Sequence, residues 1–311
     1  MLVQKTEKRV FTKKSNLRRS FGWQDRILDG IIVAALIIVA ISTLYPLYFV
    51  LIASFSNPVH IGNGEVILWP RGANLLAYET LIADGRIWIG YRNSLFYTTV
   101  GTFLNLCVTV PCAYALSRRN LPGQKIFFFF FMFTMYFSGG MIPTYVLMSQ
   151  LKLLNTIWIM IIPNGIGVFN LLIARSFFRE NIPEELFDSA RIDGASITRF
   201  FFYFVIPLSK AIIAVLTLFY ALGHWNAYFY PMLYLQDSSK LPLQVVIRGI
   251  TANLDANVIE GYNPSQISEM VLRQQLLKYA IVVVSVVPMM LLYPFIQKYF
   301  VSGIMIGAVK G

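Results

Sequence analysis

An unbroken run of uncharged residues near the start of the chain constrains its fold more than any other feature. The run covers residues 30–55, and these 26 residues would extend about 39 Å as an α-helix. This length exceeds the roughly 30 Å hydrocarbon core of a bilayer, so the segment is long enough to cross a membrane with some tilt. It is also too long for the apolar part of a signal peptide, and we expect it to remain in the protein as a membrane anchor.

The composition predicts more than one membrane span. Apolar residues make up 57% of the 311 residues and charged residues only 13%, which would cover a water-soluble fold with exposed apolar surface. We therefore expect an all-α membrane protein with six transmembrane helices. The six predicted spans are residues 29–56, 91–117, 125–150, 157–178, 207–235 and 277–297.

Positive charges are concentrated in alternate connections. Eighteen of the 26 Lys and Arg residues fall before the first span, after spans two and four, and after span six. Because short connections rich in Lys and Arg are retained in the cytoplasm, both termini are predicted to be cytoplasmic. The predicted organisation is a basic cytosolic segment (1–26), a six-helix membrane domain (27–297) and a glycine-rich cytosolic tail (298–311). The same rule and contact with lipid headgroups explain the net charge of +11, so we expect no nucleic-acid binding.

The connection between spans four and five, residues 179–207, is predicted to form a helix, a sharp turn and a second helix. Pro183 presets φ for a first turn, and Glu185 places negative charge at the positive end of the helix dipole. Gly194 can adopt the left-handed conformation that closes a helix, and Ser196 can accept hydrogen bonds from the first N–H groups of the next one. Such an element suits docking to a cytosolic partner, although capped helices also occur in loops without any partner.

Catalytic chemistry finds little support in the sequence. There are only two histidines and two cysteines, with no HExxH helix, no nucleophile elbow and no paired carboxylates inside a span. We therefore expect a non-catalytic chain that binds no metal or cofactor. The sequence also lacks a G-x-x-x-x-G-K-[ST] loop, so a pump built on this chain must obtain ATP-derived work from another chain.

Three other functional classes are the alternatives to such a pump. An ion-coupled secondary transporter commonly uses charged groups in the membrane interior, and the centres of the predicted spans contain none. An enzyme and a membrane assembly factor are the remaining two.

Polar residues within two predicted spans are candidates for a substrate path. They are His224, Trp225, Asn226 and Tyr228 in span five, and Asn164 and Asn170 in span four. Aromatic rings can cover the C–H face of a sugar while Asn and His exchange hydrogen bonds with its hydroxyl groups, without a charge to desolvate. Trp and Tyr equally serve as anchors at the membrane interface. Pro163, Gly165 and Gly167 would either open span four locally or allow close helix packing.

The residues from Asp188 onward resemble the EAA loop of binding-protein-dependent ABC importer permeases. In that loop Glu-Ala-Ala is followed four residues later by Gly, and here Asp188-Ser189-Ala190 is followed by Gly194. Asp for Glu and Ser for Ala keep the charge and the small size. The later Ile206-Pro207 also fits the pattern, and Asp193-Gly194-Ala195 is common in the carbohydrate branch of the family.

The rest of the chain supports the same resemblance. Residues 300–311 are similar to the glycine-rich tail of the smaller membrane subunit of the maltose importer. Residues 136–145 and 224–231 resemble the subgroup that imports complex oligosaccharides such as aldouronates. The chain is thus similar over its whole length to a type I ABC importer permease of the carbohydrate branch.

The resemblance implies the partners and the site residues. A second, different permease would complete the path, two ATPase subunits or domains would bind ATP and Mg, and an extracytoplasmic binding protein would deliver sugar. The chain would be a multi-pass protein of a bacterial cytoplasmic membrane. The residues implied to couple to the ATPase are Glu185, Asp188, Ser189, Ala190, Asp193, Gly194, Ala195 and Pro207. Lys310 and Gly311 of the tail are implied to touch the ATPase interface.

Overall fold

The computed structural model describes residues 23–256 and 271–291, together with residue 294. The chain divides into two units, residues 1–49 and residues 50–311. Throughout the described ranges every regular element is helical, and no strand occurs in them. The expected all-α class is therefore confirmed.

The first unit contains most of α1 (Trp23–Ser54), and the apolar side chains of this helix are exposed on all sides over residues 26–48. Ile38, for example, is 68% exposed. The hydroxyl of Thr43 donates to the carbonyl of Val39 at 2.9 Å, so this polar group is satisfied by the helix itself. A helix that is apolar all round and pairs its own polar groups is suited to a lipid environment.

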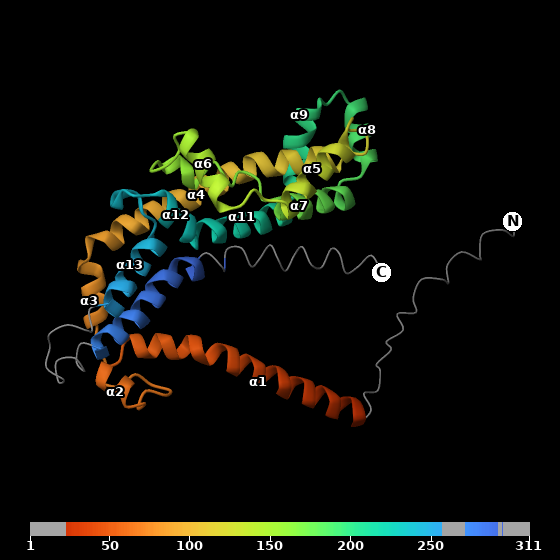
Figure 1. The fold of residues 1–311 in the computed structure, drawn as a ribbon. Coiled ribbons are helices and arrows are strands. Elements are labelled where there is room, and N and C mark those ends of the chain that lie inside the picture. Colours follow the sequence, from red (N-terminus) through yellow and green to blue (C-terminus); the bar gives the residue numbers. More distant parts are fainter. Residues whose placement is uncertain (1–22, 257–270, 292–293, 295–311) are drawn as a thin grey trace. The chain divides into compact units, whose positions relative to one another are not determined.

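The second unit is assembled around α4 (Gly85–Ser117), a helix of 33 residues. Figure 1 shows α7 (Val168–Asn181) and α11 (Lys210–Trp225) running beside it, and α13 (Leu243–Ala256) packs near its start. Gly90 permits the last of these contacts, because a Cβ atom there would lie 3.0 Å from Cα of Leu243. The helix at the centre of this unit also carries buried polar side chains, including Asn93, Asn105 and Thr109, which find their partners on neighbouring segments.

Shorter elements connect these helices. The α-helices are α2 (Pro58–Gly62), α3 (Leu76–Ala83), α5 (Gln124–Tyr136), α6 (Met141–Gln150), α8 (Glu184–Ile192), α9 (Ile197–Phe200), α10 (Ile206–Leu208) and α12 (Phe229–Tyr234). The others are the 3₁₀ turns η1 (Ile157–Met160) and η3 (Ser238–Lys240) and the π-helix η2 (Phe201–Val205). A further helix covers Val271–Leu291.

Three helices are long and apolar enough to cross a membrane, and two bent pairs raise the number of candidates to five within the described part of the chain. The three are Arg26–Ser54, Gly85–Ser117 and Val271–Leu291. The bent pairs are Gln124–Tyr136 with Met141–Gln150, at 114°, and Ile197–Leu208 with Lys210–Trp225, at 80°. Six spans were predicted, and the count of six remains a prediction.

The predicted spans are less regular than the apolar pattern indicates. The segment predicted as span three breaks where Gly140 adopts a positive φ of 86°. The segment predicted as span five is interrupted at Ser209, next to the π-helix, because Pro207 has no N–H to donate to the carbonyl of Tyr203. The segment predicted as span four contains non-helical backbone over residues 161–167, where proline and glycine open the helix.

Candidate functional site

We call residues 183–196, which form α8 and the turn that follows it, the docking region. Pro183 is the N-cap of α8, with φ of −62° and an extended ψ of 146°, so it lies one position before the first turn in which it was expected. Gly194 has φ of 80° and its N–H donates to the carbonyl of Arg191 at 3.0 Å. The Ser196 hydroxyl accepts from the N–H of Arg199 at 3.2 Å. The predicted helix, turn and helix are therefore present.

The two faces of α8 differ in exposure. Phe187 and Ala190 are buried, at 9% and 6% exposure, so the small residue at position 190 packs inward. The exposed face and the turn carry the polar and small residues of the predicted coupling set. These exposed residues are Glu185, Asp188, Ser189, Asp193 and Gly194, while Ala195 is half-buried and Pro207 lies exposed in α10.

Two large apolar side chains beside the turn are exposed and were not singled out from the sequence. Ile192 is 87% exposed at the end of α8, and Ile197 is 62% exposed at the start of α9. Their signal in the sequence is an apolar residue on each side of a polar turn. Ile192 and Ile197 thus add apolar side chains to the exposed surface around the turn.

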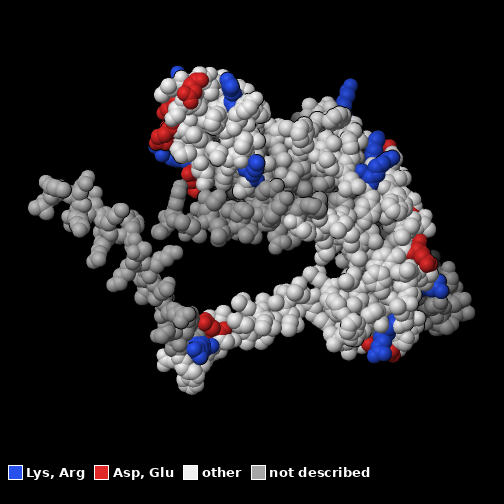
Figure 2. Space-filling view, turned by 180° about the vertical axis from the view of Figure 1, so that it is seen from behind, with Lys and Arg blue, Asp and Glu red and all other residues white. Residues whose placement is uncertain are grey.

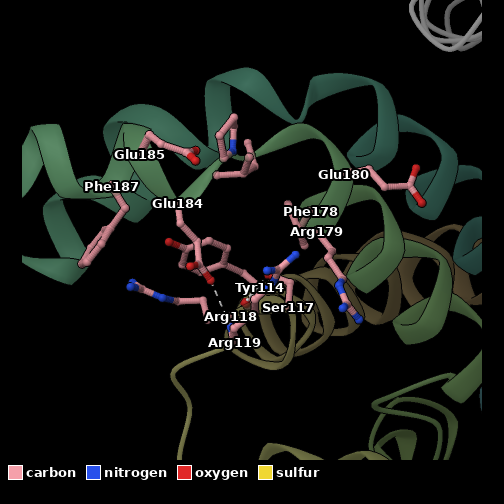
Figure 3. Close-up of a pocket in the computed structure, with 12 residues that line it drawn as sticks. Tyr114, Ser117, Arg118, Arg119, Phe178, Arg179, Glu180, Glu184, Glu185 and Phe187 are labelled. Atoms are coloured by element: carbon pink, nitrogen blue, oxygen red, sulfur yellow. Dashed lines mark hydrogen bonds between the residues drawn. The ribbon is translucent and has the colours of Figure 1, made fainter. Parts of the chain in front are cut away.

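The inward face of α8 rests on the end of α4. The guanidinium carbon of Arg118 lies 3.7 Å from the centre of the Phe187 ring, within the range of a cation–π contact. The same ring meets Phe200 edge-on, with centroids 5.2 Å apart. Figure 3 shows Arg118 extended toward Phe187, and the backbone N–H of Arg119 donates to a carboxylate oxygen of Glu184 at 3.4 Å.

A cavity of about 270 Å³ lies between these elements, lined by both charged and aromatic side chains from α4, α7 and α8 (Figure 3). Below it, the ring of Tyr114 packs against Phe178 and Phe201, at centroid distances of 5.8 and 5.5 Å. Figure 2 shows acidic and basic side chains close together around the α8 and α9 end. The docking region thus packs against aromatic rings and an arginine through one face, and its polar face is exposed.

A second cavity, of about 310 Å³, lies between the middle of α4, residues 159–170 and the end of α11. We call it the polar cavity. Its polar lining residues are Asn105, Asn164, Asn170, Tyr220, His224 and Tyr230. Asn105 is fully buried and donates to the carbonyls of Asn164 and Gly165, at 2.5 and 3.0 Å. These bonds satisfy backbone groups that the opened helix leaves without a helical partner.

A second set of bonds ties α11 to the same segment. The hydroxyl of Tyr220 accepts from the N–H of Gly167 at 3.0 Å and lies 2.7 Å from the hydroxyl of Thr109. Nε2 of His224 lies 2.7 Å from Oδ1 of Asn105. A Cβ atom at Gly101 would lie 2.5 Å from the His224 ring, so only glycine lets the ring approach α4 this closely.

The structure brings together half of the path residues predicted from the sequence. Asn164, Asn170 and His224 line the polar cavity. Trp225 does not line it, because its ring is 2% exposed and its Nε1–H donates to the carbonyl of Ser285 at 3.0 Å. Asn226 is the exposed C-cap of α11, and Tyr228 is exposed beneath the guanidinium of Arg248, at 5.1 Å.

Two further predictions concern the tail and metal binding. Lys310 and Gly311 lie outside the described residues, as does all of 298–311. Within the described ranges no group of three or more His, Cys, Asp or Glu side chains could hold a metal ion.

The structure combines membrane-length helices, a docking region packed on the end of α4, and a polar cavity between helices. These are features of a multi-pass membrane protein of the transport class. The model of the family of binding-protein-dependent transport system inner membrane components matches residues 87–306. The chain belongs to this family. Its members are transport permease subunits rather than enzymes, and the ATPase is a separate component of such systems.

Relatives and a solved structure agree with this assignment. The chain is 38% identical over 288 residues to the polygalacturonan/rhamnogalacturonan transport system permease protein YtcP of Bacillus subtilis, covering 93% of this chain and 100% of the relative. It is 27% identical to the arabinooligosaccharides transport system permease protein AraQ of Halalkalibacterium halodurans, covering 92% and 98%. A chain in the crystal structure of a bacterial ABC transporter involved in the import of the acidic polysaccharide alginate matches with a TM-score of 0.79 and 32% identity, covering 90% and 98%.

Proposed function

We propose that this permease subunit imports carbohydrate, as oligosaccharide units, in an ATP-driven complex of a bacterial plasma membrane. The names of its relatives support the substrate class, since they refer to polygalacturonan, rhamnogalacturonan and arabinooligosaccharides. The complex would contain a second permease, two ATPase subunits or domains and an extracytoplasmic sugar-binding protein. ATP and Mg would bind to the ATPases and not to this chain.

The docking region carries the coupling part of this proposal. It presents Asp188 and Ser189 outward, together with Ile192, while Phe187 fixes the opposite face to Arg118 at the end of α4. A partner that moves α8 would therefore move α4 as well. We propose that closure of the ATPases moves α8 as a lever and that the spans respond by alternating access.

The membrane arrangement completes the proposal. Six spans with both termini in the cytoplasm would place residues 179–207 against the ATPases, with 1–26 as a basic segment and 27–297 as the permease domain. The tail, 298–311, would touch the ATPase interface through Lys310 and Gly311. The proposed path residues are Asn164, Asn170 and His224, which line the polar cavity, whereas Trp225, Asn226 and Tyr228 of the predicted set do not line it.

Affinity purification in mild detergent tests the proposal. The wild-type chain should retain an ATPase with a phosphate-binding loop and a second permease, and Asp188→Lys should lose the ATPase because a positive charge replaces an exposed carboxylate of the docking face. Glu79→Lys, a charge reversal on α3, is the matched control and should retain both partners. A wild-type chain that is stable alone, with neither partner, would instead favour the secondary transporter or the assembly factor.

A further inference from the structure

A third cavity, of about 480 Å³, lies between the end of α4, the connection from α4 to α5, and the start of α9. We call it the apolar groove. Ile197 of its lining is 62% exposed, so the chain itself leaves this apolar surface uncovered. The apolar residues that line the groove are Pro111, Ala115, Leu121, Pro122, Ile197 and Phe201. Such a lining suits a hydrocarbon chain better than a hydroxyl-rich ligand.

Three arginines lie in the groove lining or directly next to it. Arg118 lines the groove, and Arg119 and Arg199 each follow a lining residue in the chain. None of the three forms an ion pair in the described part of the chain, and the described lining residues include no Asp or Glu. Glu184 lines the cavity of about 270 Å³ instead, where its carboxylate accepts from the backbone N–H of Arg119. The groove therefore complements an anionic group.

The order of apolar and basic residues along the groove matches the profile of a membrane surface. Pro111 and Ala115 lie in the last two turns of α4, a helix of membrane-spanning length, and Arg118 follows the end of this helix (Figure 3). The guanidinium of Arg199 lies 6.0 Å from the centre of the exposed Tyr203 ring. Tyrosine rings are enriched at the level of lipid headgroups. The groove thus extends from the hydrocarbon level to the headgroup level.

We propose that the apolar groove binds one anionic phospholipid, with an acyl chain against Ala115 and Ile197 and the phosphate at Arg118. The topology predicted from the sequence places this end of α4 at the cytoplasmic leaflet, which contains anionic lipids, and basic pockets between helices on that side bind anionic headgroups. The inference goes beyond the proposed function, because lipid binding requires neither a sugar nor an ATPase.

Arg118 has the geometry to bind a phosphate while it supports the docking region. The face of its guanidinium lies on the ring of Phe187, at 3.7 Å, and its N–H donors project from the edge of the same plane. Guanidinium edges bind phosphate oxygens through two parallel hydrogen bonds. A lipid held at this edge would keep Arg118 against Phe187, so that hydrogen exchange in α8 would be slower when the groove is occupied.

The first experiment measures bound lipid. The full-length chain is purified in mild detergent with the subunits that it retains, equilibrated with a mixture of phosphatidylcholine and phosphatidylglycerol, and analysed by native mass spectrometry. Arg118→Gln removes the cation, and Ala115→Trp fills the groove. Phe187→Leu removes the ring beneath Arg118 but leaves the groove lining intact, and Ala35→Trp adds the same bulk on the exposed surface of α1.

The wild-type chain should retain phosphatidylglycerol in preference to phosphatidylcholine. Arg118→Gln should retain about tenfold less phosphatidylglycerol, as expected for the loss of a charge-assisted hydrogen bond, and Ala115→Trp should lose it as well. Phe187→Leu and Ala35→Trp should retain as much as wild type. Equal retention of the two lipids by the wild type, or wild-type retention by both groove variants, would overturn the inference. If Ala115→Trp does not assemble, Ala115→Leu replaces it.

The second experiment identifies the occupant of the groove in the membrane. A photoreactive phenylalanine analogue is placed at Ile197, and vesicles that contain phosphatidylglycerol are illuminated. The chain should gain the mass of one phospholipid, and Arg118→Gln should reduce this adduct. A crosslink to a second permease, or to another segment of this chain, would show that protein fills the groove. That result would overturn the inference and leave the proposed function unchanged.

Discussion

The docking region and the polar cavity are both supported by α4, but by different interactions. At the end of the helix, Arg118 and Tyr114 support α8 and its neighbours through ring contacts. In the middle, Asn105 and Thr109 hold their neighbours by hydrogen bonds. Ring contacts tolerate small displacements, whereas hydrogen bonds weaken steeply with distance and angle. The docking base is thus suited to transmit a continuous movement, and the cavity wall is suited to change between discrete states.

The largest expected effect comes from Gly194→Pro in the docking region. Proline fixes φ near −65° and removes the N–H that bonds to Arg191, so the turn with φ of 80° cannot form. Sugar uptake should be abolished while the amount of protein in the membrane is unchanged. Gly194→Asn is the control, because asparagine tolerates the left-handed region, and it should keep most of the uptake. Normal uptake by the proline variant would exclude a lever at this turn.

Removing the ring contact beneath α8 should have the next largest effect. Arg118→Ala and Phe187→Leu should each accelerate hydrogen exchange in α8, and the double variant should add little, since a cation–π contact contributes about 0.5–2 kcal/mol. Arg179→Ala is the control, an arginine that lines the same cavity. Fully additive effects of the two substitutions would show that the residues act independently.

Gly101→Ala tests the polar cavity without removing any polar group. The new methyl would lie 2.5 Å from the His224 ring, which must move away from Asn105. Import should fall by about tenfold, corresponding to one lost hydrogen bond. Gly249→Ala has open space at its Cβ position and should behave as wild type. Unchanged import by Gly101→Ala would show that the pairing of His224 with Asn105 is dispensable.

Trp225→Phe separates packing from substrate contact. Phenylalanine keeps an apolar ring but leaves the carbonyl of Ser285 without its donor, at a cost of about 1–3 kcal/mol. The melting temperature of the complex should fall, and the preference among sugars should stay the same. A changed preference would place Trp225 in the path, as the sequence predicted.

The smallest effect is expected at Asp237, outside both regions. Hydrogen bonds from Ser239 and Lys240 lower the pKa of its carboxyl group to about 2. Because the folded pKa lies below the usual value of about 3.9, the carboxylate stabilises the turn above pH 4, and this contribution is lost as the pH falls toward 2. Hydrogen exchange of residues 236–241 should therefore rise below pH 4 in the wild type and depend less on pH in Asp237→Asn. An equal dependence in both would contradict the assigned role.

Local signals explain which parts of the site were predictable. Gly194 and Ser196 act within one turn of chain, so their roles in closing and starting helices could be read from the sequence. Pro163 and its neighbouring glycines likewise marked the opened helix. Asn105 could not be found in this way, because its partners lie 59, 60 and 119 residues away along the chain.

The direction in which each side chain points from its helix could not be predicted from the sequence either. Trp225 directly follows His224, yet one ring packs inside the core while the other lines the cavity. Adjacent positions on a helix point about 100° apart, and the sequence does not state which neighbour each one faces. The inward position of Ala190 within the coupling set has the same cause.

The non-helical backbone at residues 161–167 has a consequence for how the protein enters the membrane. Its carbonyls at Asn164 and Gly165 depend on α4, which is synthesised earlier, but the N–H of Gly167 depends on Tyr220 of α11, which is synthesised later. A backbone group left unpaired in lipid costs several kcal/mol. We therefore expect this segment to wait in a hydrated environment during biogenesis and to settle into the bilayer together with α11, as one cooperative step.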